Sequence, residues 1–153
     1  MTATVFSLLR ATPADRPQDP APPRYIAIVD DDEGVRRAYA RLIGAYSFHV
    51  QAYGSGTEFL VSVGTRVPAC VIVDLQMQDM TGLELLHRLA DMGLRIPGIV
   101  VTARDEPGVQ KRCELCGATD LLVKPVRGDD LLRAIAHAIS APGCSDVQSG
   151  TNS

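Results

Sequence analysis

The sequence predicts a doubly wound α/β fold with one five-stranded parallel sheet. The first observation is a set of five short apolar runs, several of them apolar throughout, as expected for strands buried on both faces. These runs are Tyr25–Val29, Phe48–Tyr53, Ala69–Val73, Ile96–Val101 and Thr119–Val123. The second observation is that segments with a helical period separate them. Alternating strands and helices imply a parallel sheet covered on both sides, with right-handed crossovers.

Three of the intervening segments carry a clear apolar face at helical spacing. The faces are Val35, Tyr39, Leu42, Ile43 and Tyr46; then Leu83, Leu86 and Leu89; then Leu131, Leu132, Ile135 and Ile139. Start signals accompany them. Ser55–Glu58 and Thr81–Glu84 have the form of a capping box, and Asp129 with Asp130 lies where a helix N-terminus favours negative charge.

The chain of 153 residues fits one domain with flanking segments. We expect a domain over residues 25–140, a disordered proline-rich extension over residues 1–24 and a disordered polar tail over residues 141–153. Apolar residues make up 46% and charged residues 22%, which is ordinary for a soluble globular protein. A net charge of −3 gives no electrostatic reason to expect nucleic acid or an anionic membrane as partner.

The four cysteines are scattered and do not form the pattern of a secreted disulfide framework. Cys113 and Cys116 are spaced with Val109 as one helical face, so we interpret them as buried apolar residues; a redox or zinc site is the less favoured alternative. No apolar run is long enough for a signal peptide or a membrane span. The sequence therefore predicts a soluble, cytoplasmic protein.

Polar side chains collect at the carboxyl ends of the predicted strands. They are Asp30, Asp31, Asp74, Thr102 and Lys124. In an open parallel sheet these ends share one edge, where ligands bind, so we expect the five side chains to meet in one crevice.

The chemistry of these side chains is complementary. Carboxylates brought close together repel one another, and a divalent cation relieves that repulsion. Oxygen ligands alone suit Mg²⁺, while His49, His87 and His137 fall elsewhere in the pattern and do not suggest zinc. A lysine and a hydroxyl can stabilise the oxygens of a transferring phosphoryl group, and a carboxylate can accept that group as an acyl phosphate.

Each residue alone has a plainer explanation. Acidic residues after a strand often cap the next helix, and Asp32 with Glu33 suits that role here. Asp79, near the acidic residues, is interpreted as a loop residue. The convergence of five residues on one sheet edge is what favours the functional interpretation over capping.

The same residues resemble a known family. The stretches YIAIVDDD from Tyr25, VDLQM from Val73, VTA from Val101 and Lys124–Pro125, with Gly82 eight residues beyond Asp74, are together similar to the receiver domain of two-component response regulators. The resemblance covers about residues 24–140, and the local pattern is similar to receivers usually fused to a helix-turn-helix output.

The resemblance implies a flavodoxin-like fold and a set of roles. Asp30, Asp31 and the main-chain carbonyl of Gln76 would hold Mg²⁺ with Asp74, and Asp74 would accept a phosphoryl group from a histidine kinase or a histidine phosphotransfer protein. Thr102 would turn toward the phosphoryl group and Lys124 would pair with its oxygens. The Lys124–Pro125 peptide bond would be cis.

The sequence departs from the family pattern in three respects that matter. Gln78 stands where the family usually has proline, and Leu121 stands where it usually has an aromatic switch residue. The second departure puts in doubt the usual coupling between the threonine and an inward-moving ring. Gln76 and Arg104 occupy positions that influence acyl-phosphate lifetime in the family.

The resemblance further implies a module that is not an enzyme but promotes its own phosphorylation and dephosphorylation. Because little sequence follows the last predicted helix, we expect a single-domain regulator that acts on a protein target, through about residues 107–139, or in a phosphorelay. A monomer or a phosphorylation-dependent dimer is expected. Two alternatives stay open: a degenerate receiver that binds without phosphorylation, and a Mg²⁺-dependent aspartyl phosphatase, disfavoured because Gln76 replaces its usual second acid.

Overall fold

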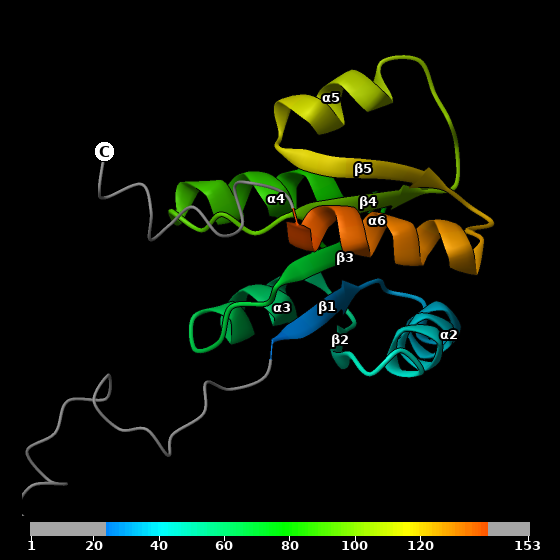
Figure 1. Ribbon diagram of the computed structural model, residues 1–153. Coiled ribbons are helices and arrows are strands. Elements are labelled where there is room, and N and C mark those ends of the chain that lie inside the picture. The colour runs from blue at the N-terminus through cyan, green and yellow to red at the C-terminus, as the bar shows by residue number, and fades with distance from the viewer. Residues whose placement is uncertain (1–23, 141–153) are drawn as a thin grey trace, which may run out of the picture.

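The computed structural model describes residues 24–140, which form one five-stranded parallel sheet with five helices. The predicted disordered ends lie outside the described residues apart from Arg24. The strands are β1 (Tyr25–Val29), β2 (His49–Tyr53), β3 (Cys70–Asp74), β4 (Gly98–Thr102) and β5 (Ala118–Val123). The helices are α2 (Glu33–Gly44), α3 (Gly56–Val63), α4 (Gly82–Asp91), α5 (Val109–Leu115) and α6 (Gly128–Ser140). The strand order is β2-β1-β3-β4-β5 (Figure 1), so the predicted doubly wound fold is confirmed.

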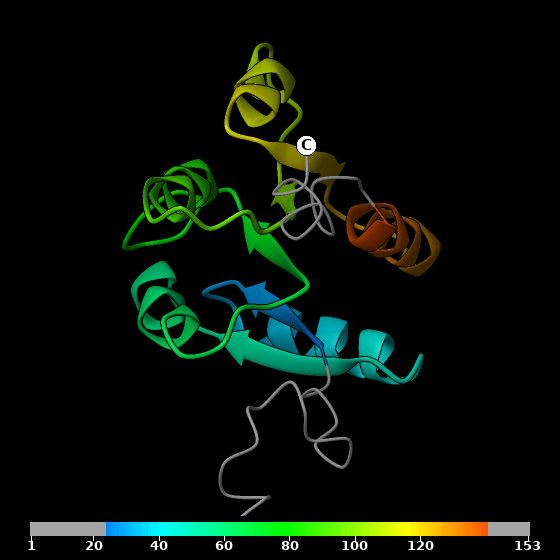
Figure 2. The ribbon, with the colours of Figure 1, turned by 60° about the vertical axis from the view of Figure 1, so that its left-hand side comes forward.

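Helices cover both faces of the sheet, as alternation of side chains along each strand requires. Ala27, Val71 and Val100 point to the side of α3, α4 and α5. Ile28, Ile72 and Ile99, one position along, point to α2 and α6. Figure 2 shows α2 and α6 on one side of the sheet and α3 and α4 on the other. Two apolar cores therefore sandwich the central strands.

Burial differs between central and edge strands. Every residue of β1, β3 and β4 is buried, whereas β2 and β5, which each pair on one side only, keep partly exposed residues. The prediction of strands buried on both faces therefore holds for the three central strands. Strand bounds also move slightly: Asp74 and Thr102 are the last residues of β3 and β4 instead of following them.

The predicted helix start signals are confirmed. Asp32 accepts a hydrogen bond from Val35 N and caps α2, and Ser55 accepts one from Glu58 N at the start of α3. At α4, Thr81 and Glu84 form the complete reciprocal capping box. These caps fix where each helix leaves the edge of the sheet that carries the polar residues.

Two residues that periodicity assigned to buried faces lie elsewhere. Tyr46 is 59% exposed, because α2 ends at Gly44 and the chain turns away before it. Cys116 is only partly buried, because α5 ends at Leu115 and Cys116 is its C-cap, whereas Cys113 is buried as predicted. Within the part of the chain that the structure describes, no helix is both long and apolar enough to cross a membrane.

Candidate functional site

The predicted acidic cluster forms at the carboxyl ends of β1 and β3, which are neighbours in the sheet. Carboxylate oxygens of Asp30, Asp31 and Asp74 all lie within 4.8 Å of one another. Asp30 and Asp74 are buried, whereas Asp31 is exposed. A hydrogen bond from Asp32 N to Asp30 Oδ1 at 2.9 Å holds the first carboxylate. The edge of the sheet thus presents a compact group of oxygen ligands, open to solvent on the side of Asp31.

Lys124, directly after β5, reaches into this cluster. Its Nζ lies 3.4 Å from Asp30 Oδ2 and 3.6 Å from Asp74 Oδ2. Its backbone N–H donates to Thr102 O at 2.7 Å, which joins the ends of β4 and β5. The Lys124–Pro125 peptide bond is cis, as expected. The lysine therefore stands as a fixed positive charge between two buried carboxylates.

Thr102 and Gln76 lie beside the cluster. Thr102 is buried, and its hydroxyl donates to Arg104 O at 3.0 Å and accepts from Arg104 N at 3.2 Å. In this structure the hydroxyl is therefore engaged with the following loop. Gln76 is exposed, and its backbone N–H hydrogen-bonds the Asp74 carboxylate.

The three carboxylates of the site carry more negative charge than Lys124 neutralises. Burial, reinforced by the Asp30 charge and opposed by Lys124, raises the pKa of Asp74. Burial alone lowers the pKa of Lys124, but the carboxylates of Asp74 and Asp30 outweigh it and leave that pKa raised. Three carboxylates against one ammonium leave a formal charge of about −2, which matches a divalent cation.

Gly82 brings α4 against the end of β3. A Cβ at this position would lie 2.6 Å from Asp74 O, and Gly82 N donates to Leu75 O at 2.8 Å. No side chain larger than hydrogen fits such an approach without a shift of the backbone. Glycine therefore stands eight residues beyond Asp74 because a side chain there would collide with the Asp74 backbone.

Asp79 lies in the loop between β3 and α4, as predicted, and is not one of the three clustered carboxylates. Its carboxylate accepts from Thr57 N at 2.9 Å, from Thr57 Oγ1 at 2.9 Å and from Gly56 N at 3.4 Å. Desolvation works in the opposite direction, but these hydrogen bonds lower the pKa of Asp79. Asp79 therefore caps the N-terminus of α3 from the loop after β3.

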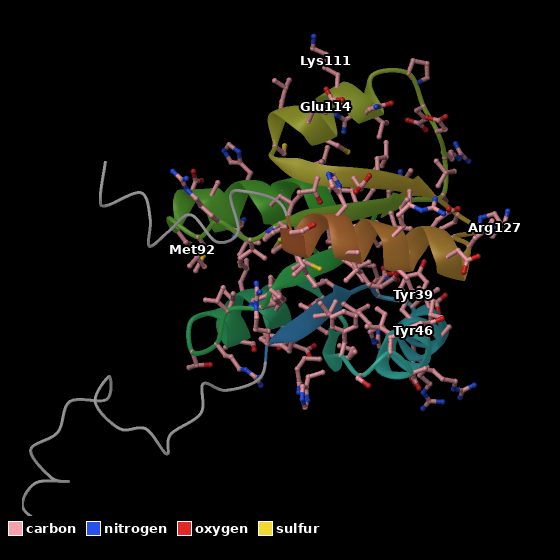
Figure 3. The ribbon with its side chains drawn as sticks, in the orientation of Figure 1. Tyr39, Tyr46, Met92, Lys111, Glu114 and Arg127 are labelled. Atoms are coloured by element: carbon pink, nitrogen blue, oxygen red, sulfur yellow. The ribbon has the colours of Figure 1, made fainter. Side chains whose placement is uncertain are left out.

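Two residues at the site are absent from the sequence prediction. Arg36 Nη1 donates to Asp30 O at 2.7 Å and ties α2 to the end of β1. Tyr39 is half-buried in an open depression that Lys124 and Pro125 also line. Burial, opposed by Lys124 and reinforced by Asp30 and Asp74, raises the pKa of Tyr39. Helical periodicity put Tyr39 on the inward face of α2, but only the fold shows that it lines the same depression as Lys124 and Pro125. Figure 3 labels Tyr39 on α2.

The histidines on predicted helices are exposed, as expected. His87 lies 3.8 Å from Asp91 along α4, and His137 Nδ1 lies 2.9 Å from Asp120 Oδ2 across α6 and β5. Both lie outside the three-carboxylate cluster. The site is therefore built from oxygen ligands and one lysine.

Comparison with known proteins agrees with this geometry. The sequence profile described as "Response regulator receiver domain" matches residues 26–136, which is most of the chain. The chain belongs to the response-regulator receiver family. The residues that carried the resemblance are the ones that the receiver fold gathers at its sheet edge.

Several response regulators are similar to this receiver. It is 36% identical to the response regulator protein TmoT of Ectopseudomonas mendocina over 74% of this chain and 52% of that protein. It is 33% identical to the transcriptional regulatory protein FixJ of Rhizobium meliloti over 74% of this chain and 55% of that protein. The chain spans about half the length of these relatives.

Solved receivers have the same fold. The crystal structure of FixJ-N matches with a TM-score of 0.73 and 30% identity, over 79% of this chain and 97% of that one. The chemotaxis protein CheY4 of Vibrio cholerae matches with a TM-score of 0.72 at 23% identity, over 76% of this chain and 99% of that one, which supports the fold alone.

The two residues that replace the usual aromatic residue and proline of the receiver pattern lie in different parts of the fold. Leu121 lies in β5, partly buried against the core on the side of α3, α4 and α5. Gln78 is exposed in the loop between β3 and α4. The departure at Leu121 thus changes the β5 side of the site, whereas the acidic cluster and Lys124 are complete.

Proposed function

We propose that this receiver domain is a phosphoacceptor signalling module in which Asp74 accepts a phosphoryl group. The observation that supports this most is the position of the Asp74 carboxylate. It lies within 4.8 Å of the Asp30 and Asp31 oxygens and 3.6 Å from Lys124 Nζ. A carboxylate beside metal ligands and a fixed ammonium has the environment that phosphoryl transfer requires.

In the proposed step, an Asp74 carboxylate oxygen attacks the phosphorus of a phosphohistidine. The phosphohistidine reacts with its other ring nitrogen protonated, so that the new P–O bond forms as the P–N bond breaks and the donor histidine leaves as neutral imidazole. Lys124 stabilises the phosphoryl oxygens, and the Thr102 hydroxyl exchanges its bonds with the Arg104 backbone for one to the phosphoryl group. Water later cleaves the acyl phosphate and regenerates the Asp74 carboxylate. In this proposal the module promotes its own phosphorylation and dephosphorylation and is not an enzyme on other substrates.

Mg²⁺ fits the acidic cluster by charge and ligand type. Asp30, Asp31 and Asp74 would hold it together with the main-chain carbonyl of Gln76, which lies in the loop just after β3. A hard cation with carboxylate and carbonyl ligands, completed by water and a phosphate oxygen, is the usual arrangement for Mg²⁺. The metal, when bound, neutralises charge that develops on the phosphoryl group.

The proposed partners follow from this chemistry. A histidine kinase or a histidine phosphotransfer protein would supply the phosphoryl group. A protein target would bind through about residues 107–139, which include α5, β5 and α6. The receiver would act as a monomer or dimerise when phosphorylated.

Leu121 favours one alternative, a receiver whose target binding does not depend on phosphorylation, because the usual aromatic switch residue is missing. Comparison of target affinity before and after phosphorylation distinguishes the two. A target that prefers the phosphorylated form must also stabilise that form, by linkage. An aspartyl phosphatase is disfavoured, since Gln76 offers no second acid two residues beyond Asp74.

Beryllium fluoride, a stable phosphoryl mimic, tests the site. We expect bound-fluoride signals in ¹⁹F NMR that need Mg²⁺, that vanish in Asp74→Asn and that persist in the matched control Asp91→Asn, an exposed carboxylate at the end of α4. Absence of bound fluoride in the folded wild-type protein with Mg²⁺ would overturn the proposal, and persistence in Asp74→Asn would place the acceptor elsewhere.

A further inference from the structure

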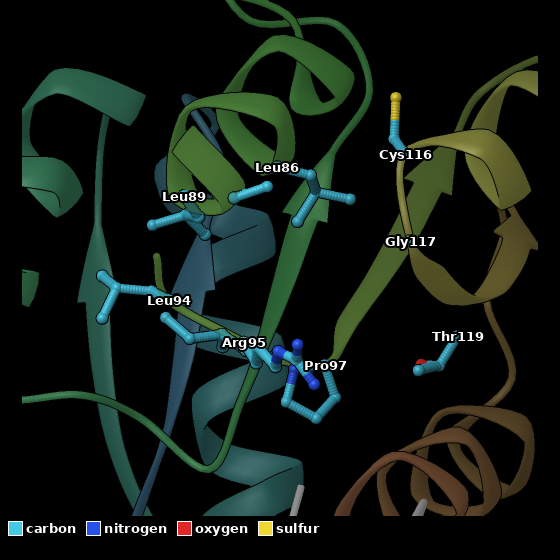
Figure 4. A pocket seen from close by; sticks show the side chains of 10 residues that line it. Leu86, Leu89, Leu94, Arg95, Pro97, Cys116, Gly117 and Thr119 are labelled. Carbon is cyan, nitrogen blue, oxygen red and sulfur yellow. The ribbon is translucent and has the colours of Figure 1, made fainter. Parts of the chain in front are cut away.

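An apolar cavity lies at the end of the sheet opposite the acidic cluster, with a volume of about 340 Å³. Its walls come from Leu86 and Leu89 of α4, Ile96 and Pro97 before β4, and Cys116 and Thr119 around the start of β5. Figure 4 shows these side chains around a space between α4 and the chain that enters β5. The cavity is thus separate from the residues proposed to bind Mg²⁺ and phosphate.

The cavity forms where the pairing of β4 and β5 is irregular. Gly98 pairs with Ala118 but Ile99 pairs with Asp120, so Thr119 is an extra residue in β5. The Thr119 hydroxyl donates to Gly98 O at 3.2 Å, which satisfies its polar group. On the α4 side, a Cβ on Gly98 would lie 2.6 Å from Leu86 Cδ2. Leu86 and Thr119 both line the cavity, which therefore lies beside this irregular pairing.

Arg95 is the one charged residue among those that line the cavity, and it is exposed. It has no ion pair or side-chain hydrogen bond with another of residues 24–140. The helix C-termini nearby are capped by turn amides: Leu94 N donates to Leu89 O at 3.0 Å and Gly117 N to Glu114 O at 3.0 Å. The guanidinium is therefore the one charged side-chain group among the residues that line these apolar walls.

We propose that this cavity binds a small amphiphilic monocarboxylate. Its hydrocarbon part lies against Leu86, Leu89 and Ile96, and its carboxylate pairs with Arg95. The volume is at the lower end of the range for ligand pockets, which suits a ligand of roughly ten non-hydrogen atoms. Apolar walls with one polar group that fixes orientation are the usual composition of such sites.

Three probes with the same alkyl chain separate the apolar and charged contributions: octanoate, octan-1-ol and octylammonium. The readout is the rate at which iodoacetamide alkylates Cys116 of the full chain, measured by peptide mapping that distinguishes it from Cys70, Cys113 and Cys144. Cys116 lines the cavity and is partly buried, so an occupant slows its reaction. Amide chemical shifts of Gly117 and Thr119 give a second, label-free readout.

We expect saturable protection by octanoate at low-millimolar concentration, about threefold weaker protection by octan-1-ol and about tenfold weaker protection by octylammonium, as one exposed ion pair allows. Arg95→Gln should weaken octanoate about threefold and leave octan-1-ol unchanged. Arg88→Gln, an exposed arginine of α4 away from the cavity lining, should change neither. Ala90→Leu, at an exposed helical position that lines the cavity, should weaken both.

Failure of all three probes to protect Cys116 or to shift the Gly117 and Thr119 amides would overturn the site. Equal protection by the three head groups, or an unchanged octanoate affinity in Arg95→Gln, would overturn its preference for anions. Beryllium fluoride binding at Asp74 is measured separately, so either proposal can fail while the other stands.

Discussion

Among single residues, Lys124 decides how much of the negative charge of the acidic cluster is neutralised. It lies between two buried carboxylates, 3.4 Å from Asp30 and 3.6 Å from Asp74. In the proposed function, the same ammonium would oppose a bound cation and attract phosphoryl oxygens. It would therefore affect metal binding and phosphoryl transfer in opposite directions.

Lys124→Met tests this opposition. Removal of one nearby positive charge should tighten Mg²⁺ binding roughly fivefold, measured by calorimetry, as expected for one charge a few ångströms away. Phosphorylation by acetyl phosphate should slow at least about tenfold, because the phosphoryl oxygens lose their ammonium. Lys111→Met, on the exposed side of α5, is the control. Unchanged Mg²⁺ affinity in Lys124→Met would contradict the assignment of the metal to this cluster.

The raised pKa of Asp74 predicts a pH-dependent stability without Mg²⁺. A carboxyl group whose folded pKa is raised favours the fold when protonated, and that stability is lost as pH rises through the folded pKa. Above the folded pKa the ionised Asp74 therefore destabilises the fold, and there Asp74→Asn should raise the free energy of unfolding by roughly 1 kcal/mol.

Urea denaturation of both proteins across pH measures this difference. The advantage of Asp74→Asn should shrink as pH falls through the folded pKa of Asp74 and should also shrink when Mg²⁺ is added at neutral pH. If the wild-type protein were more stable than Asp74→Asn at about pH 7 without Mg²⁺, burial and Asp30 would not raise the pKa of Asp74 enough to destabilise the fold.

At the scale of elements, the start of α4 is held against the end of β3 by the absence of a side chain at Gly82. Gly82→Ala should lower the free energy of unfolding by about 2 kcal/mol or more, because its Cβ would lie 2.6 Å from a backbone oxygen. Gly44→Ala, in α2 with no atom within 4 Å of the new Cβ, should be neutral or slightly stabilising. Chemical denaturation compares the two, and equal effects would contradict the steric reason for Gly82.

Asp79 and Asp31 are both exposed acids near the sheet edge but have different structural roles. Asp79→Ala removes a helix cap and should cost about 1 kcal/mol of stability while leaving Mg²⁺ affinity unchanged. Asp31→Ala removes a proposed metal ligand and should weaken Mg²⁺ binding with little loss of stability. Calorimetry measures Mg²⁺ affinity and denaturation measures stability in the same two variants. A loss of Mg²⁺ affinity in Asp79→Ala would show that Asp79 also contributes to the metal site.

The difference between these two acids also shows what the sequence predicts well. Asp30 and Asp74 follow from strand-end position, because neighbouring parallel strands end at one edge. The role of Asp79 depends on contacts with Gly56 and Thr57, more than twenty residues earlier, which no local pattern predicts. Periodicity likewise assigned Tyr46 to a core because it does not show that α2 ends at Gly44.

In the molecule as a whole, the strand order of the sheet brings the site residues together. β1 and β3 lie side by side in the middle of the order β2-β1-β3-β4-β5, so Asp30 and Asp74 meet where the direction of winding changes. Alternation of strands and helices predicts parallel pairing, but the order itself comes from resemblance to the receiver family. The cavity beside Thr119 was not predictable, because it lies next to a bulge between β4 and β5 that no local pattern indicates.

The most direct test of the phosphoacceptor assignment is the intact mass of the protein after incubation with acetyl phosphate and Mg²⁺. We expect one added phosphoryl group that needs Mg²⁺, is released by hydroxylamine as an acyl phosphate and is absent from Asp74→Asn. A phosphoryl adduct that persists in Asp74→Asn, or a wild-type protein that neither gains the adduct nor binds beryllium fluoride, would contradict Asp74 as the acceptor.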